Sequence, residues 1–464
     1  MDLTAIVLCG EGKHLHPIAS VRSGVPKALL PVANQPLLSY GLEWIEKLFF
    51  SKIIVVAQGS RGDDIRKYVE EQYEKKSDTA IEVFQTDNQY SGEIIASLAG
   101  RVSGDFVVLP CDFITGDVDP QEVLKLYYNR DQERALISGV YYRNNIDTIE
   151  KKALSIDYLV HTPLSGKDPK LLDVYSKEWV QDHKGLELRT SMMWRYPNGV
   201  VSTNILDASI YLCSHKVLDL FNVAAATDDE NDDSREDQSV SVLNKSWSQV
   251  VRDVARRSWR HKSQCEEVWM HVLDSAKTTF IRANNLSSYL EANRYIMKQH
   301  ASQIGRAGGA SGKVGGSGSV GSDSLVGSET VLGQRTTVKR TVVGNNCTIG
   351  SKCRITGCVI LDGVNIQDDV VLENCLIGKK ANIGTRAKLT GCNVEGGYQV
   401  LTGFQTKNET LQNVNIEGFI EEAAPSEDEE ETEEESDDGS EEDNIEEDWN
   451  DDDGDFSGDD LFER

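Results

Sequence analysis

No apolar run in this chain of 464 residues approaches the roughly 20 residues that a membrane-spanning helix needs. The N-terminus has no basic segment ahead of the apolar run Leu3–Leu8, so no signal peptide is predicted. Nine cysteines follow no short-spaced metal-binding pattern, and a chain of this length can bury a core without disulfides. We therefore expect reduced thiols, a cytosolic location, and neither a membrane nor DNA as partner.

Positive charge is almost missing from the C-terminal segment. Residues 421–464 contain 25 Asp or Glu and a single Arg, whereas the whole chain has a net charge of −28. So many like charges with so few apolar residues predict a disordered acidic tail over residues 416–464. Two uses stay open: a solubilising tail, or a docking segment for a lysine-rich partner around Trp449, Phe456, Leu461 and Phe462.

The N-terminal part alternates short β-rich runs with helical stretches. Strands are predicted at Ala5–Leu8, Lys52–Val56, Ile81–Phe84, Asp105–Leu109 and within Ser202–Leu212, and helices at Leu37–Phe50 and Asp63–Glu74. Strands separated by helices indicate a mostly parallel sheet with crossover helices. The fold class is thus α/β, with a Rossmann-like domain over residues 1–300 and a Gly/Ser-rich linker over residues 301–319.

Two polar segments interrupt this first domain. The Asp-rich insertion Thr227–Gln238 is predicted to be a disordered surface loop. The run Arg256–Lys262 is the densest basic cluster, and it is interpreted either as a solvated face or as a contact for RNA or an acidic partner.

A repeat begins near Val320. Aliphatic residues recur every 17 positions in three series, and this period predicts three short strands per coil of a triangular β-solenoid over residues 320–415. Cys358, Cys375 and Cys392 follow the same period, which favours a stacked column of thiols over metal ligation. The last coil would expose strand edges, so a subunit interface or a cap is expected there.

Two loops carry the candidate phosphate chemistry. Strand Ala5–Leu8 leads into Cys9-Gly10-Glu11-Gly12, where glycines let backbone amides approach a phosphate. The segment Val25–Pro36 adds a Pro-Lys loop in which Lys27 offers a point charge. Read alone, Gly10 and Gly12 also fit an ordinary turn.

These two runs resemble the signature of the sugar nucleotidyltransferases, the pyrophosphorylase family, many of whose members carry a left-handed β-helix. In that family the first loop reads Leu-Ala-Gly-Gly-x-Gly-Thr-Arg-Leu, and its arginine grips the triphosphate. Here that position is His14, and Glu11 adds a negative charge. Asp112 follows a strand where the family holds a metal, although an Asp there also commonly caps a helix.

The resemblance also implies that Gln85–Leu98 occupies the place where active enzymes of the family carry the segment that helps recognise the base. Gly92 matches the family pattern, whereas Glu93 does not. We therefore predict no catalytic residue, no cofactor and no metal. Vestigial nucleotide or phosphate binding is assigned to Gly10, Gly12, Lys27, Gly92 and Asp112.

The segment Phe280–Arg294 resembles the joining helix of the gamma and epsilon subunits of eukaryotic translation initiation factor 2B, and Leu206–Tyr211 resembles the gamma segment. Epsilon chains continue into a helical exchange domain, whereas this sequence ends in the acidic tail, which points to gamma. The resemblance implies a non-catalytic, regulatory subunit of the exchange factor for initiation factor 2. It would act with epsilon to promote GDP release and GTP loading.

The same resemblance implies a two-fold decamer with alpha, beta and delta subunits and initiation factor 2 as the protein substrate. The alternative is a nucleotide-sugar pyrophosphorylase, similar to mannose-1-phosphate guanylyltransferase, or the regulatory subunit of such an enzyme.

Overall fold

The computed structural model describes residues 3–19, 25–59, 62–77, 79–146, 148–149, 154, 156–166, 168–222, 240–260, 266–307, 315–316 and 318–413. All of them belong to one compact unit, residues 1–413. The predicted acidic tail at 416–464 and the insertion Thr227–Gln238 lie outside the described residues. None of the helices in the described part is long and apolar enough to cross a membrane.

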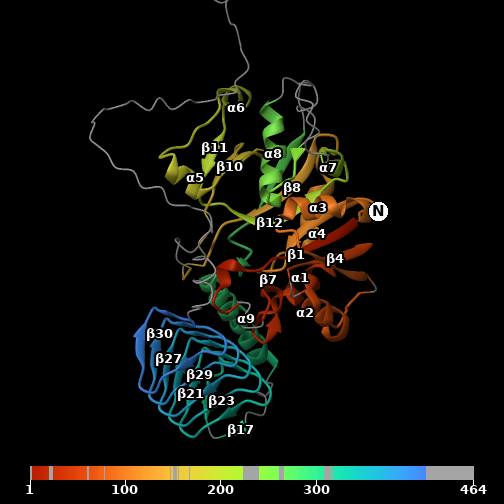
Figure 1. Ribbon diagram of the computed structural model, residues 1–464. Helices are drawn as coiled ribbons and strands as arrows, with labels where there is room; N and C mark the ends of the chain where they lie inside the picture. Colours follow the sequence, from red (N-terminus) through yellow and green to blue (C-terminus); the bar gives the residue numbers. More distant parts are fainter. Residues whose placement is uncertain are drawn as a thin grey trace, which may run out of the picture. The chain divides into compact units, whose positions relative to one another are not determined.

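A ten-stranded sheet forms the centre of the N-terminal domain, in the order β11-β9-β10-β15-β8-β12-β6-β1-β4-β5 (Figure 1). Its strands are β1 (Leu3–Cys9), β4 (Lys52–Gln58), β5 (Ala80–Thr86), β6 (Asp105–Pro110), β8 (Ala135–Tyr142), β9 (Tyr158–His161), β10 (Lys170–Tyr175), β11 (Val200–Ser202), β12 (Leu206–Cys213) and β15 (Glu267–Val272). Smaller pairings join β2 (Pro31–Val32) to β3 (Gln35–Pro36), β7 (Phe113–Thr115) to β16 (Phe280–Arg282), and β13 (Phe221–Asn222) to β14 (Val240–Ser241).

The predicted parallel arrangement is confirmed in the first half of this sheet. β1 pairs in parallel with both β4 and β6, and β4 pairs in parallel with β5. Beyond β6 the sheet is mixed, since β12 runs antiparallel to both β6 and β8. Parallel strands bring their carboxyl ends to one edge, so the loops after β1 and β6 meet there.

Helices cover both faces of the sheet, because successive residues of a buried strand point to opposite sides. Ala5 and Val7 pack in a core with helices α1 and α4, whereas Ile6 packs in the core that contains α3 and α8. The helices are α1 (Leu37–Ile45), α2 (Gly62–Lys67), α3 (Ser91–Ser97), α4 (Pro120–Tyr128), α5 (Lys177–Asp182), α6 (Thr190–Arg195), α7 (Lys216–Asp219), α8 (Trp247–Arg260) and α9 (Leu286–Ala307).

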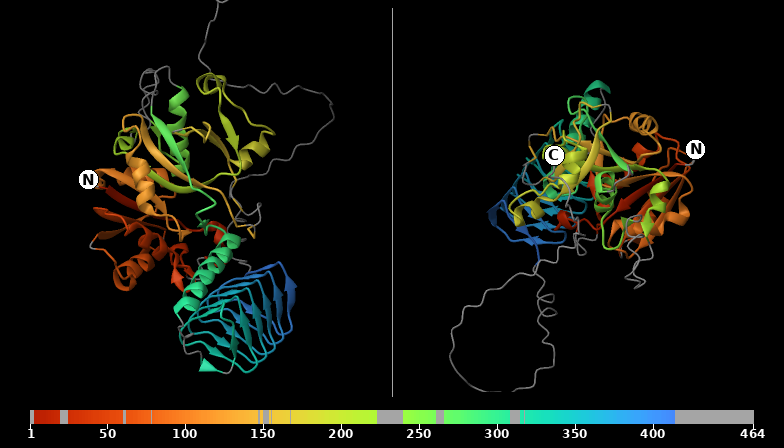
Figure 2. Two further views of the ribbon diagram at one scale, coloured as in Figure 1. Left: turned by 180° about the vertical axis from the view of Figure 1, so that it is seen from behind. Right: turned by 90° about the horizontal axis from the view of Figure 1, so that it is seen from above.

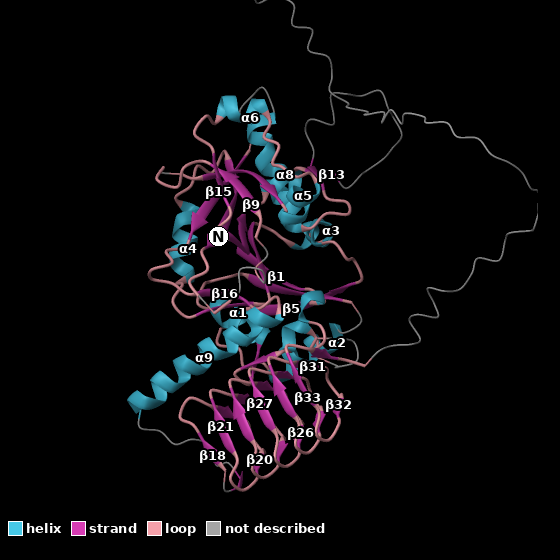
Figure 3. Ribbon diagram, turned by 90° about the vertical axis from the view of Figure 1, so that its left-hand side faces the viewer, coloured by secondary structure: helices cyan, strands magenta, loops and turns pink. Residues whose placement is uncertain are grey.

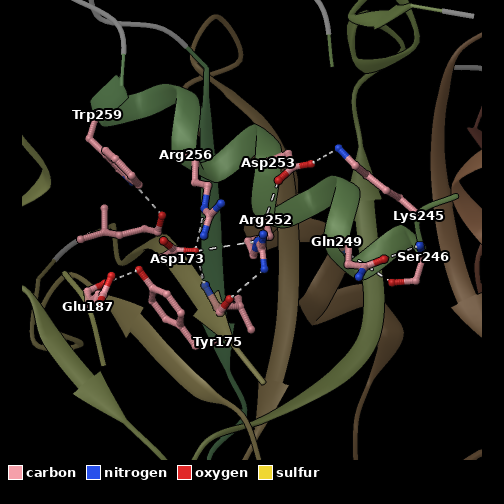
Figure 4. Close-up of polar contacts among 12 residues, drawn as sticks. Asp173, Tyr175, Glu187, Lys245, Ser246, Gln249, Arg252, Asp253, Arg256 and Trp259 are labelled. Atoms are coloured by element: carbon pink, nitrogen blue, oxygen red, sulfur yellow. Dashed lines mark hydrogen bonds and ion pairs between the residues drawn. The ribbon is translucent and has the colours of Figure 1, made fainter. Parts of the chain in front are cut away.

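Part of the basic cluster at the end of α8 packs inside the domain. Neither the predicted solvated face nor the predicted contact with RNA or an acidic partner describes this arrangement. Arg256 Nε lies 2.9 Å from Asp173 Oδ1, and Trp259 donates to the Leu172 carbonyl at 2.8 Å (Figure 4). Arg257 is buried and forms an ion pair with Glu266 at 2.7 Å. Arg256 thus holds α8 against β10, because a buried carboxylate such as Asp173 requires a partner. Residues 261–262 lie outside the described residues.

The predicted β-solenoid is confirmed. Three parallel six-stranded sheets form its faces, in the orders β17-β20-β23-β26-β29-β32, β18-β21-β24-β27-β30-β33 and β19-β22-β25-β28-β31-β34 (Figure 3). The strands are β17 (Gly315–Gly316), β18 (Ser319–Val320), β19 (Leu325–Val326), β20 (Val331–Leu332), β21 (Thr337–Lys339), β22 (Val342–Val343), β23 (Thr348–Ile349), β24 (Arg354–Thr356), β25 (Val359–Ile360), β26 (Asn365–Ile366), β27 (Val371–Glu373), β28 (Leu376–Ile377), β29 (Asn382–Ile383), β30 (Lys388–Thr390), β31 (Asn393–Val394), β32 (Gln399–Val400), β33 (Gln405–Lys407) and β34 (Thr410–Leu411).

The aliphatic series and the thiol column both face the solenoid core. Ladders such as Ile349, Ile366 and Ile383 are buried there, one residue per coil. Cys358, Cys375 and Cys392 are free and buried, and the Cys375 amide donates to the Cys358 sulfur at 3.4 Å. Each coil thus buries its face against its neighbours, which explains why the 17-residue period is kept from β19 onward.

Helix α9 joins the two parts of the unit, and it lies beside the coil stack in both Figure 1 and Figure 2. Asn293 is fully buried and accepts from the Ala33 amide at 2.9 Å, while the Asn34 side chain donates to the Val343 carbonyl at 3.0 Å. The structure places the end of α9 at Ala307 and the first paired solenoid strand at Gly315–Gly316. Both of these positions lie within residues 301–319, the predicted linker.

Truncation of a core ladder residue tests the solenoid. We expect Leu389→Ala to lower the free energy of unfolding of this part by about 2–5 kcal/mol, since Leu389 is fully buried and would leave a cavity. The matched control is Lys388→Ala, which alters an exposed residue of the same strand and should change the free energy by less than about 0.5 kcal/mol. Hydrogen exchange of the solenoid amides measures both, and equal effects would contradict the assignment of Leu389 to the core.

Candidate functional site

The first candidate loop follows β1. Gly12 has a φ of 78°, a left-handed conformation that favours glycine, and a Cβ placed there would lie 2.9 Å from the Lys27 Cβ. Gly12 therefore lets the β1 loop pack directly against the Pro-Lys loop. In this way the structure brings the two predicted loops together.

Asp112 is the charged centre of the site. Its side chain is fully buried; its Oδ2 lies 2.6 Å from Lys27 Nζ, and its Oδ1 lies 2.8 Å from Arg282 Nε. Arg282 Nη2 adds a hydrogen bond to Oδ2 at 3.3 Å. Burial opposes ionisation of this carboxyl, but Arg282 and Lys27 together hold the pKa of Asp112 well below its ordinary value.

Both oxygens of Asp112 are thus used by protein cations. The carboxylate of this residue faces positive charge from two side chains. No group of three or more metal-binding side chains occurs among the described residues. The residue after Asp112 begins β7, so the alternative role as a helix cap does not apply.

A cavity of about 250 Å³ opens beside these loops. Its walls come from β1, β4, α3, β6, β12 and α8, and among the predicted residues Gly10 and Lys27 reach it. Polar or charged lining is supplied by Gln58, Gln89, Ser91, Ser209, Tyr211, Ser248 and Arg282. The lining therefore mixes amide and hydroxyl groups with two cations, Lys27 and Arg282, that are already paired with Asp112.

A second cavity of about 180 Å³ shares Ser209, Tyr211, Ser248 and Arg282 with the first. It is lined by two carboxyl groups, Asp157 and Asp207. The pairing register of β12 shifts between Asp207 and Ile210, and Ser209, within this irregular stretch, has a φ of 53°. Ser209 lines both cavities. Burial raises the pKa of Asp207, which accepts hydrogen bonds from the Tyr211 hydroxyl and the Ser209 amide.

Gly92 has a packing role in this structure. Its amide donates to the Lys245 carbonyl at 3.0 Å, and an added Cβ would lie 2.8 Å from that oxygen. The neighbouring Glu93 accepts a hydrogen bond from the Asn244 amide at 2.8 Å. The segment that would recognise a base is therefore tied to the turn before α8.

The predicted residues divide into two groups. Gly10, Gly12, Lys27 and Asp112 converge at one end of β1 and β6, whereas Gly92 lies on α3 and contacts Lys245 without lining the cavity. His14 and Glu11 are exposed and do not line the cavity.

Sequence reasoning did not assign a role to Arg282, Asp207 or Tyr211. Arg282 was visible only as part of the joining segment, and its distance of 170 positions from Asp112 gave no sign of the ion pair.

Comparisons with known proteins agree with this architecture. The nucleotidyl transferase family model matches residues 4–147, and the model of the EIF2B subunit epsilon LbH domain matches residues 310–405. Translation initiation factor eIF2B subunit gamma of Schizosaccharomyces pombe is 27% identical over 314 residues, 64% of this chain and 66% of that protein. The resemblance to eIF2B gamma subunits is confirmed.

Other relatives match shorter segments. The gamma subunit of Dictyostelium discoideum is 27% identical over 213 residues, 42% of this chain and 46% of that protein. Bifunctional protein GlmU of Methanococcus maripaludis strain C7 is 25% identical over 219 residues, 47% of this chain and 42% of that protein. The matches thus span between 42% and 66% of the length of these curated relatives.

Removing the charge of Asp112 tests the buried ion pairs. Asp112→Asn would leave Lys27 and Arg282 without their shared carboxylate, and we expect a loss of about 3–5 kcal/mol in the free energy of unfolding. Urea denaturation measures it. The control Asp87→Asn changes an exposed residue and should have an effect below about 0.5 kcal/mol; a similar small effect at Asp112 would contradict the structural role.

Asp157 gives a pH-dependent prediction. Burial raises its pKa from 3.8 to about 6, and Asp207 and Glu178 act in the same direction. The folded protein therefore binds a proton that the unfolded chain has already released. The stability that this group contributes is complete below about pH 4 and is lost as the pH rises through about 6.

The measurement is the difference in unfolding free energy between the unchanged protein and Asp157→Asn. We expect the variant to become relatively more stable from pH 4 to pH 7, because the amide cannot ionise. A difference that is flat, or that changes in the opposite direction, would contradict the raised pKa.

Proposed function

We propose that this protein is a non-catalytic, regulatory subunit of a guanine-nucleotide exchange factor for translation initiation factor 2. The proposal is supported by the similarity to two gamma subunits and by the epsilon-type family model over the solenoid. Its N-terminal domain would serve as an inherited scaffold for protein contacts, and the exchange itself would be carried by an epsilon subunit.

The observation that carries this proposal is the pair of contacts at Asp112. A carboxylate already bound to Lys27 and Arg282 is poorly available to a metal, and Lys27 is correspondingly less available to a phosphate. The position of the family's phosphate-gripping arginine is an exposed His14, and the exposed Glu11 would repel a triphosphate. Each of these differences from the family pattern would weaken nucleotidyl transfer.

The partners follow from the same proposal. An epsilon subunit would be the direct partner, and alpha, beta and delta subunits would complete a two-fold decamer that acts on GDP-bound initiation factor 2. Such an assembly would work in the cytosol.

The alternative function is nucleotidyl transfer to a sugar phosphate, by this chain or under its regulation. The family model over residues 4–147 and the similarity to GlmU favour it. So does the cavity of about 250 Å³, where Gly10, Lys27 and Arg282 still meet.

Three experiments separate these functions. With fluorescent GDP on initiation factor 2, the chain alone should not accelerate release, whereas addition to an epsilon subunit should raise the epsilon-dependent rate. Native purification of the tagged chain should recover epsilon together with the other subunits. Release of pyrophosphate from a nucleoside triphosphate and a hexose 1-phosphate with magnesium, at rates typical of enzymes, would overturn the proposal and support the alternative.

A further inference from the structure

A separate cavity of about 360 Å³ lies where α9 meets the solenoid. It shares no lining residue with the two cavities at the end of β1. Its volume falls within the range of about 300–1,000 Å³ that is typical of small-molecule sites. Met297 of α9 is the apolar side chain of the lining and is itself only 4% exposed. The other lining side chains are polar or charged, although carbon atoms make up most of the lining surface.

One wall of this cavity is fixed by hydrogen bonds. Arg294 Nη2 donates to the Asn374 side-chain oxygen at 2.8 Å and to the Gly357 carbonyl at 3.2 Å, while Nη1 binds Glu291. Gly357 has a φ of 68°, and a Cβ there would lie 3.4 Å from the guanidinium and only 2.4 Å from the Asn374 oxygen. The solenoid corner is therefore shaped to receive this arginine, which gives the cavity a preformed wall.

Two further cations line the cavity, Lys298 on α9 and Arg340 at a solenoid corner, and both are exposed. Neither side chain forms an ion pair with a described acidic residue. The nearby Asp323 carboxylate instead accepts from the Arg340 backbone amide at 3.2 Å. The lining carries three cations and two carboxylates, so it has an excess of one positive charge.

We propose that this cavity binds a small organic anion that combines an apolar body with one acidic group. The apolar body would cover Met297 and displace water from the lining. The acidic group would face Lys298 and Arg340, because a hydrogen bond from an ammonium or guanidinium group to an anion is stronger than one between neutral groups. A molecule bound there touches α9 and the solenoid together, so its binding would favour the joined arrangement of the two.

The test uses 1-anilinonaphthalene-8-sulfonate, which has one sulfonate on an aromatic body. The full chain contains five methionines, so methyl NMR of labelled methionine resolves them, and Met297→Ala identifies the Met297 signal. We expect this probe to shift the Met297 signal saturably. N-phenyl-1-naphthylamine, which lacks the charge, and inorganic sulfate, which lacks the apolar body, should each bind at least about tenfold more weakly.

Matched variants locate the acidic group of the probe. Arg340→Glu and Lys298→Glu should each weaken binding by about tenfold or more. The control is Arg335→Glu, because Arg335 is also an exposed corner residue of the solenoid, with a φ of 59° against 50° for Arg340, but does not line the cavity. Binding to that variant should be unchanged.

Three results would overturn the proposal. The first is an unshifted Met297 signal at millimolar probe, and the second is equal binding by the uncharged naphthylamine. The third is an unchanged affinity in Arg340→Glu and Lys298→Glu while the folded spectrum is retained. None of these results depends on the exchange activity.

Discussion

The buried carboxylate of Asp112 is the constraint on which the rest of the folded unit depends. It lies at the carboxyl end of β6, where it meets Lys27 from the Pro-Lys loop and Arg282 from β16. α9 begins at Leu286, shortly after β16 ends at Arg282. The ion pairs of Asp112 therefore fix the Pro-Lys loop and the start of α9 together. A charge buried so deeply is tolerated only because both cations are held within hydrogen-bonding distance.

The ion pairs of Asp112 with Lys27 and Arg282 also bear on what the site can bind. In a parallel sheet the loops after β1 and β6 necessarily meet, and this geometry is retained together with a polar cavity. The charges in it, however, are satisfied within the protein. A site whose carboxylate and lysine already neutralise each other has less free energy to gain from metal and phosphate, which supports the proposed non-catalytic role.

The solenoid and α9 form a second centre of organisation. The 17-residue repeat stacks identical aliphatic positions, and its corners are left-handed turns that admit Gly357 or Asn374. α9 uses one such corner to anchor Arg294, and the space left between helix and coils is the cavity lined by Met297. This cavity is therefore lined by both α9 and the solenoid, and neither of them would form it alone.

The sequence by itself determined the elements whose signal is local or periodic. The β1 run, the glycine loop and the 17-residue ladders were all predictable, because strand burial and coil stacking repeat a simple pattern along the chain. Only the tertiary structure decided that Asp112 binds Arg282, that Gly92 packs on Lys245, and that Arg256 pairs with Asp173. Those contacts join residues 83 to 170 positions apart, and a single contact between such distant residues leaves no periodic pattern in the sequence.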